Sequence, residues 1–177
     1  MEIGAFGATA LLMGWLGIVE LAAHQIAITC AATTFMIPLG ISLAVAIRVG
    51  QALGSGQPER ARIIAFGASG FTLLMAFVFA SGFIFFNQTL ASLFTSDPDT
   101  LVLAAGLIVI AGFFQVFDGV QVLFVGALRG CKDVVKPTWI IFASFWIVGI
   151  PAGALLAFPL NLGAPGLWYG ISAGLAS

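Results

Sequence analysis

Charged side chains are scarce in this sequence. Its 177 residues include 6 lysines and arginines and 7 aspartates and glutamates, so charged residues make up 7% of the chain and hydrophobic residues 61%. A soluble domain carries about a quarter charged residues, so this composition excludes an ordinary water-soluble domain. The basic residues are also too few for a nucleic-acid-binding surface, and no nucleic-acid partner is expected.

Cysteine and histidine are almost absent as well. The 2 cysteines, Cys30 and Cys131, lie far apart, belong to no CxxC pair and have no histidine cluster near them in sequence. Neither a disulfide framework nor a structural metal site is indicated, and no cofactor is expected. Both cysteines are interpreted as small packing residues.

Long apolar runs are what the chain has in abundance. A membrane span needs about 20 apolar residues, and such runs follow one another with short polar breaks. The pattern predicts an all-α, polytopic transmembrane bundle in which residues 1–177 form one unit, with the lipid bilayer as its surroundings. The six expected helices cover residues 3–19, 21–47, 63–94, 101–128, 139–160 and 162–177.

The basic residues lie in two of the breaks between these runs. They are Arg48, Arg60 and Arg62, and then Arg129, Lys132 and Lys136. Cytoplasmic loops of membrane proteins carry an excess of lysine and arginine. We therefore expect a multi-pass protein of the inner (plasma) membrane, with loops 48–62 and 129–136 in the cytoplasm.

Proline and glycine occur together inside two of the apolar runs. Pro38 and Gly40 lie in the second run, and Pro151 follows Gly149 in the fifth. Because proline lacks a backbone donor, helix breaks are predicted at Pro38, Gly40 and Pro151. Such breaks often line transport pathways; the alternative is close helix packing through small residues.

Asp118 is a carboxylate inside an apolar run. It lies about 15 Å of helix from Arg129, near the midplane of the membrane, where an acid costs about 2.5 to 3.5 kcal/mol on insertion scales. Helical spacing places Gln115 and Gln121 on the same broad side as Asp118, which predicts a cavity wall. The alternative is a buried acid whose hydrogen bonds are satisfied by Gln115 or a neighbouring helix.

Glu2 is the second acid expected at intermediate depth. It shares a helical stripe with Phe6, Thr9 and Met13, which is predicted to face the interior. Both ends of the chain look cut through a helix, so a fragment of a longer protein is expected; a complete small protein is the alternative. A desolvated acid readily takes up a proton or a cation, so Glu2 and Asp118 are interpreted as coupling-cation sites, with a structural role for each as the alternative.

Two further motifs have weaker interpretations. His24, beside Gln25, could act as a proton relay, a polar residue at the start of a helix or an interfacial contact. Gly170 to Gly174 match GxSxG around Ser172, the spacing of a serine nucleophile elbow. Small-residue membrane helices readily produce this string and no base is visible near it, so the chain is not expected to be an enzyme.

Several stretches together resemble the multidrug and toxic compound extrusion (MATE) transporters, in their NorM-like bacterial branch. These stretches are residues 21–26, 38–40, 48–57, 117–121 and 126–133. The resemblance implies helices seven to twelve of a twelve-helix, two-lobe transporter. An amino-terminal six-helix lobe would then be its missing partner.

The resemblance also implies roles for individual residues. Glu2 and Asp118 match acids tied to cation coupling, so Na⁺ could bind there, and the expected cavity-lining residues are Gln115, Gln121, Phe114, Thr9 and Met13. Phe114, one turn before Asp118, stands where some relatives have a tyrosine that assists cation binding. Phenylalanine offers no oxygen ligand, which favours the proton over sodium.

The leading hypothesis is therefore a secondary active antiporter that exports cationic drugs in exchange for H⁺ or Na⁺. A flippase for lipid-linked sugars, from the related superfamily, would need intramembrane lysine or arginine for phosphates, and none is expected here. A membrane scaffold without transport activity would have no need of acids at the midplane.

Overall fold

The chain folds into helices throughout the part that the structure describes. A computed structural model describes the backbone of residues 2–176 and the side chains of residues 4–176. In chain order the elements are α1 (Glu2–Leu16), α2 (Ile18–Gly54), α3 (Pro58–Phe85), α4 (Asn87–Ser92), α5 (Pro98–Gly130), α6 (Val135–Phe142), the π-helical η1 (Ala143–Gly149), α7 (Ile150–Ala157) and α8 (Gly163–Ala176). The all-α membrane fold predicted from the sequence is confirmed.

Among the described residues, four helices are long and apolar enough to cross a membrane. They are α2, α3, α5 and the continuous helix formed by α6, η1 and α7. The first and last helices, α1 and α8, contain 15 and 14 residues. At 1.5 Å per residue they extend over about 21 to 23 Å, less than the roughly 30 Å hydrocarbon core. Within the described residues, the expected six spans are thus four full-length helices and two shorter ones.

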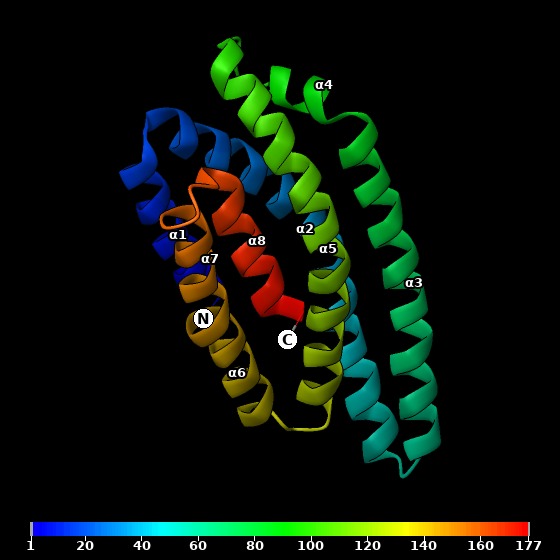
Figure 1. The fold of residues 1–177 in the computed structure, drawn as a ribbon. Coiled ribbons are helices and arrows are strands. Elements are labelled where there is room, and N and C mark those ends of the chain that lie inside the picture. Colours follow the sequence, from blue (N-terminus) through cyan, green and yellow to red (C-terminus); the bar gives the residue numbers. More distant parts are fainter. Residues whose placement is uncertain (1, 177) are drawn as a thin grey trace.

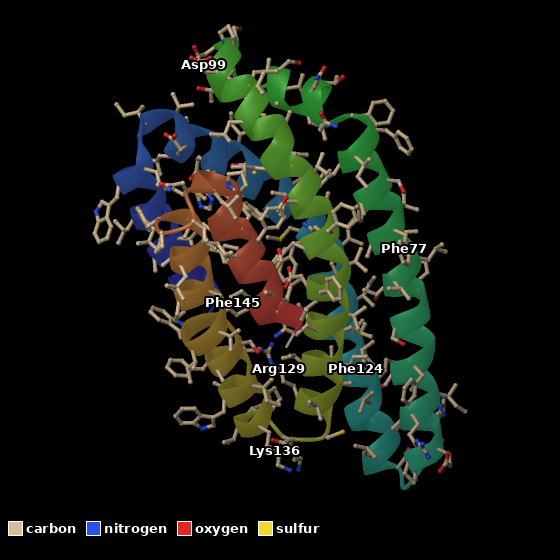
Figure 2. The ribbon with its side chains drawn as sticks, in the orientation of Figure 1. Phe77, Asp99, Phe124, Arg129, Lys136 and Phe145 are labelled. Atoms are coloured by element: carbon tan, nitrogen blue, oxygen red, sulfur yellow. The ribbon has the colours of Figure 1, made fainter. Side chains whose placement is uncertain are left out.

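The helices form a bundle with α5 at its centre (Figure 1). On one side α5 packs along α2 and α3, and on the other it contacts α8, which also packs against η1 and α7. The core includes Leu107 and Ile108 from α5 together with Leu167 and Trp168 from α8. The outer helix α3 exposes large apolar side chains such as Phe77, labelled in Figure 2, as a lipid-facing helix should.

The basic residues lie in or beside two turns at one end of this bundle. In Figure 1 the connection between α2 and α3 and the connection between α5 and α6 are both at the bottom. Figure 2 shows Lys136 at that end and Asp99 at the opposite end. The fold therefore gathers the positive charges on one side of the expected membrane.

Helix ends differ from the expected ones where polar residues continue a helix. The second helix runs on to Gly54 and the third begins at Pro58, so the predicted loop 48–62 is mostly helical. Gly56, with φ of 73°, makes the turn between them. The predicted helix 63–94 ends at Phe85, where the Asn87 side chain donates a hydrogen bond to the carbonyl oxygen of Ile84 over 2.6 Å, and α4 follows separately.

The two proline sites behave differently. The helix α2 continues through Pro38 and Gly40, although its earlier and later halves run in different directions in Figure 1. The prediction of a helix break at Pro38 and Gly40 is therefore wrong, because α2 is continuous through both residues. Before Pro151, by contrast, the chain forms the π-helical segment η1, a wider turn of the kind found where the regular hydrogen-bond ladder is disturbed.

Candidate functional site

A cavity of about 410 Å³ lies between α1, α2 and α5. Its wall is apolar except for two side chains from α5, Gln115 and Asp118. Met36, on the α2 side, is exposed, so the cavity opens to the surface of this chain. The other residues of the described wall are Phe6, Ile28, Ala31, Ala32, Phe35, Leu39 and Phe114.

Asp118 is a buried carboxylate in this cavity, with 8% of its surface exposed. It lies eleven residues before Arg129 on α5, about 16 Å along the helix axis. No lysine or arginine belongs to the described wall of the cavity. The carboxylate therefore lies in surroundings of low polarity, where any positive charge that enters is attracted strongly to it.

Gln115 connects the two helices that form most of the wall. Its side-chain nitrogen donates hydrogen bonds to the carbonyl oxygen of Ala31 over 2.6 Å and to the hydroxyl of Thr34 over 2.7 Å. Thr34 in turn donates back to α2, to the carbonyl oxygen of Ala31 over 3.0 Å. The buried amide of Gln115 is thus satisfied by α2 and holds that helix beside Asp118.

Aromatic rings close the cavity toward the core. Phe6 of α1 meets Phe114 of α5 edge to face, with ring centroids 5.9 Å apart. Phe114 also packs edge to face on Trp168 of α8 at 6.2 Å. Aromatic faces attract organic cations, so these rings add to the suitability of the cavity for a flat cationic ligand.

Two glycines of α5 near Asp118 pack against α2 and α3. A Cβ at Gly119 would lie 3.5 Å from Thr72 of α3 and 3.7 Å from Pro38 of α2. At Gly126 a Cβ would overlap the Ser42 side chain and backbone, and Ser42 donates a hydrogen bond to the carbonyl oxygen of Val122 over 2.7 Å. These contacts on α2 and α3 set the orientation in which α5 presents Asp118.

Some residues predicted to line the cavity lie outside its described wall. Thr9 is buried, and its hydroxyl donates to the carbonyl oxygen of Ala5 over 2.9 Å, so it is satisfied within α1. Met13 is fully buried in the apolar core. Gln121 has a buried side-chain oxygen without a hydrogen-bond partner among the described residues. The side chain of Glu2 lies outside the described residues, so its predicted role stays a prediction.

Two other polar residues have packing neighbours in the structure. His24 is buried, with its ring centroid 5.8 Å from that of Trp168. The Ser172 hydroxyl donates to the carbonyl oxygen of Trp168 over 2.8 Å. Gly170 and Gly174, beside it, meet the backbone of Gly153 and Gly149 so closely that a Cβ would overlap them. The GxSxG spacing therefore serves helix packing.

The sequence interpretation missed the α2 side of the cavity. Ile28, Ala31, Phe35 and Leu39 recur at helical spacing on one face of α2 and line the wall. The hydroxyl of Thr34 accepts a hydrogen bond from the Gln115 amide, and this threonine was the polar signal available on α2. Its neighbours were indistinguishable from lipid-facing residues because both environments select apolar side chains.

Comparisons with known proteins identify the family to which the chain belongs. The MatE family model matches residues 2–155. Among curated relatives, the chain is 41% identical to the "Probable multidrug resistance protein NorM" of Pseudomonas putida over 99% of its own length. It is 44% identical to the "Multidrug resistance protein NorM" of Burkholderia vietnamiensis over 100% of its length, and 37% identical to the "Multidrug resistance protein MdtK" of Yersinia enterocolitica over 99%.

The chain spans 39% of the length of each of these three relatives. A solved structure described as "Crystal structure of eukaryotic MATE transporter AtDTX14" matches 97% of the chain and 39% of that protein, with a TM-score of 0.91 and 24% sequence identity, and so shows the same fold. The family match covers most of the chain, and the relatives align with it over 99 to 100% of its length. The chain belongs to the MatE family.

Proposed function

We propose that this chain forms part of a secondary active antiporter that exports organic cations in exchange for H⁺ or Na⁺. The observation that carries the proposal is Asp118, a buried carboxylate in a cavity of about 410 Å³ whose described wall is otherwise apolar and aromatic apart from Gln115. Ligand sites for drug-sized molecules have volumes of about 300 to 1,000 Å³, so the cavity is large enough for part or all of such a cation. The relatives are named as multidrug resistance proteins, which supports drugs as the substrates.

Exchange follows from competition for one carboxylate. A buried carboxylate in a largely apolar cavity is stabilised when it binds a proton, a sodium ion or an organic cation. Two cations that compete for the same acid weaken each other's binding, so entry of the inorganic cation favours release of the organic one. In this mechanism Asp118 is the shared site, Glu2 a second acid for the coupling cation, and the rings of Phe6 and Phe114 contact the substrate.

Transport also needs the site to open alternately to the two sides of the membrane. Many secondary transporters achieve this by rocking one helical bundle against another around a fixed site. A second six-helix lobe is therefore proposed as the partner that completes the cavity. The basic residues within 48–62 and 129–136 support a cytoplasmic location for the end shown at the bottom of Figure 1.

Asp118→Asn in the full-length protein tests the proposal. The amide keeps the size of the side chain and removes its charge, so efflux of a fluorescent organic cation from cells should fall to the background of cells without the transporter. Asp99→Asn, in the exposed first turn of the same helix, is the matched control and should retain efflux. Normal efflux by Asp118→Asn at equal membrane abundance would exclude Asp118 as the coupling site.

The coupling ion is distinguished in proteoliposomes. Uptake of the organic cation is driven by an imposed proton gradient in one arm and by a sodium gradient in the other. Since Phe114 offers no oxygen ligand, the proton gradient should drive the larger uptake. The flippase alternative finds no support in the described wall, which contains no lysine or arginine to bind a phosphate.

A further inference from the structure

A second, smaller pocket lies far from Asp118, where α2 ends and α3 begins. Its volume is about 100 Å³, and its wall consists of Arg48, Gln51, Ala52, Ser55, Arg60 and Ile64. Sites for drug-sized ligands need about 300 Å³ or more, so this pocket suits a single small group. It lies at the end of the bundle that carries the basic residues (Figure 1).

The charge of this pocket is positive. Arg48 and Arg60 both belong to its wall, and neither takes part in an ion pair that the structure records among the described residues. The acid of this turn, Glu59, is paired with Arg62, with 3.8 Å between the side-chain nitrogen and oxygen. The pocket therefore presents two guanidinium groups with no acid in its wall.

The chemistry of the wall suits a phosphate group. Guanidinium groups match the geometry of phosphate oxygens and bind them with paired hydrogen bonds. Arg60 is oriented by a hydrogen bond from its Nη1 to the side-chain oxygen of Gln57 over 3.2 Å. The pocket also lies beside the first turn of α3, and the positive end of a 28-residue helix adds to the attraction for an anion.

Apolar neighbours indicate where the phosphate comes from. Ile64 belongs to the pocket wall, and Ile47 and Ile63, next to Arg48 and Ile64 of the wall in sequence, are 62% and 71% exposed. Exposed isoleucines at the ends of membrane-spanning helices are suited to contact with lipid chains, and here they adjoin a basic pocket wall in sequence. A lipid with an anionic headgroup satisfies both, whereas a free phosphate ion satisfies only the arginines.

We propose that Arg48 and Arg60 bind the phosphate group of an anionic phospholipid at the α2–α3 turn. The bound lipid holds the ends of α2 and α3 together and anchors this end of the bundle at the membrane surface. The site is separate from the cavity at Asp118 and does not depend on what that cavity transports.

Native mass spectrometry of the purified full-length protein tests this proposal. The protein is titrated in detergent with dioleoyl phosphatidylglycerol, with dioleoyl phosphatidylcholine as the zwitterionic comparison. Arg48→Gln combined with Arg60→Gln should weaken phosphatidylglycerol binding by about tenfold or more. Arg62→Gln combined with Lys136→Gln is the matched control. It also removes two positive charges, but from residues outside the pocket wall that are paired with acids.

The outcomes separate the proposal from general attraction to anionic lipid. Weakened binding in the pocket variant alone, with phosphatidylcholine binding poorly to the unchanged protein, supports the site. Equal losses in the two double variants, or no loss in either, would overturn it. A third arm replaces the lipid with inorganic phosphate at the same concentration. If the fraction of protein with bound phosphate equals the fraction with bound phosphatidylglycerol, the lipid assignment is wrong. The four substituted residues are all exposed, so both double variants should fold. Elution of each variant as a single species in size-exclusion chromatography checks this.

Discussion

Ser42 on α2 donates a hydrogen bond to the backbone carbonyl oxygen of Val122 on α5, over 2.7 Å. The two residues are 80 positions apart in the sequence. One turn further along α5, a Cβ at Gly126 would overlap the Ser42 side chain and backbone. The helices therefore cross almost backbone to backbone, a contact that small residues permit in membranes and that sets the distance between the two walls of the Asp118 cavity.

Gly126→Ala should destabilise this crossing. The added methyl group forces α2 and α5 apart, and overpacking of this kind costs about 1 to 3 kcal/mol. The thermal unfolding midpoint of the purified full-length protein should fall. Gly106→Ala is the control, because nothing lies within 4 Å of its Cβ position on the same helix, and it should leave the midpoint unchanged or raise it. Equal midpoints for the two variants would contradict the close approach.

Gln115→Leu should also loosen the contact between α5 and α2. The variant removes the hydrogen bonds to Ala31 and Thr34, and interhelical hydrogen bonds in membrane proteins contribute about 0.6 kcal/mol on average and up to about 1.7. A lower unfolding midpoint is expected than for Gln25→Leu, which changes an exposed glutamine of α2. If Gln115→Leu were as stable as the control, the amide would have no structural role.

Phe114→Tyr should change the response of transport to sodium. Phe114 and Asp118 line the same cavity one turn apart, so a hydroxyl added to this ring introduces an oxygen ligand into the wall that holds the carboxylate. We expect drug efflux by the full-length variant to increase with added sodium. By contrast, Phe124→Tyr, on α5 but outside the described cavity wall and packed on Phe66, should respond to sodium as the unchanged protein does. Identical sodium responses in all three proteins would argue against coordination at this position.

Thr100→Val should weaken the start of α5 in a pH-dependent way. The Thr100 hydroxyl and backbone N–H both donate to Asp97, over 2.6 and 3.0 Å, and hold the pKa of that carboxyl below its ordinary value. A pKa that folding lowers contributes stability above the unfolded pKa, and this stability is lost as the pH falls through the folded pKa. In a hydrogen–deuterium exchange measurement, the first backbone amides of α5 should therefore exchange faster in the variant than in the unchanged protein at neutral pH.

The difference in exchange between Thr100→Val and the unchanged protein should disappear once the pH falls below the folded pKa of Asp97, where the carboxyl is protonated in both. Thr138→Val, which removes a hydroxyl that donates to the carbonyl oxygen of Val134, serves as control and should not alter exchange at the start of α5. A difference that persists unchanged in acid would assign the effect to packing of the threonine methyl group.

The sequence was most informative where polar residues interrupt apolar runs. Asp118 and Gln115 could be placed on a cavity wall because a carboxylate or amide needs a partner or a polar surface inside a membrane. The opposite wall on α2 could not be predicted, since Ile28 and Phe35 would suit a lipid-facing surface equally well. Thr9 was misleading in a different way: its position on the helix faces inward, but its hydroxyl is satisfied by its own helix at Ala5.

Helix ends were predicted from hydropathy alone, and the structure departs from them where other forces act. Around Arg48 and Arg60, polar residues extend the helices beyond the apolar runs, because a helix that leaves the bilayer can continue in water. Pro38 does not end α2, while the chain before Pro151 forms a π-helix. A proline removes one backbone donor, and the surrounding helices decide how the chain accommodates that loss.

The π-helical segment η1 contains one residue more than a regular α-helix would need to join α6 to α7. A π-turn closes its hydrogen bond over five residues instead of four, so the residues after η1 are rotated by about 100° from where a regular helix would carry them. With this rotation Gly153 and Ala157 meet the backbone of α8 at Leu167 and Gly166. A chain one residue shorter within 143–149 would turn larger side chains toward α8, so the spacing of this segment is as much a part of the interface as its glycines.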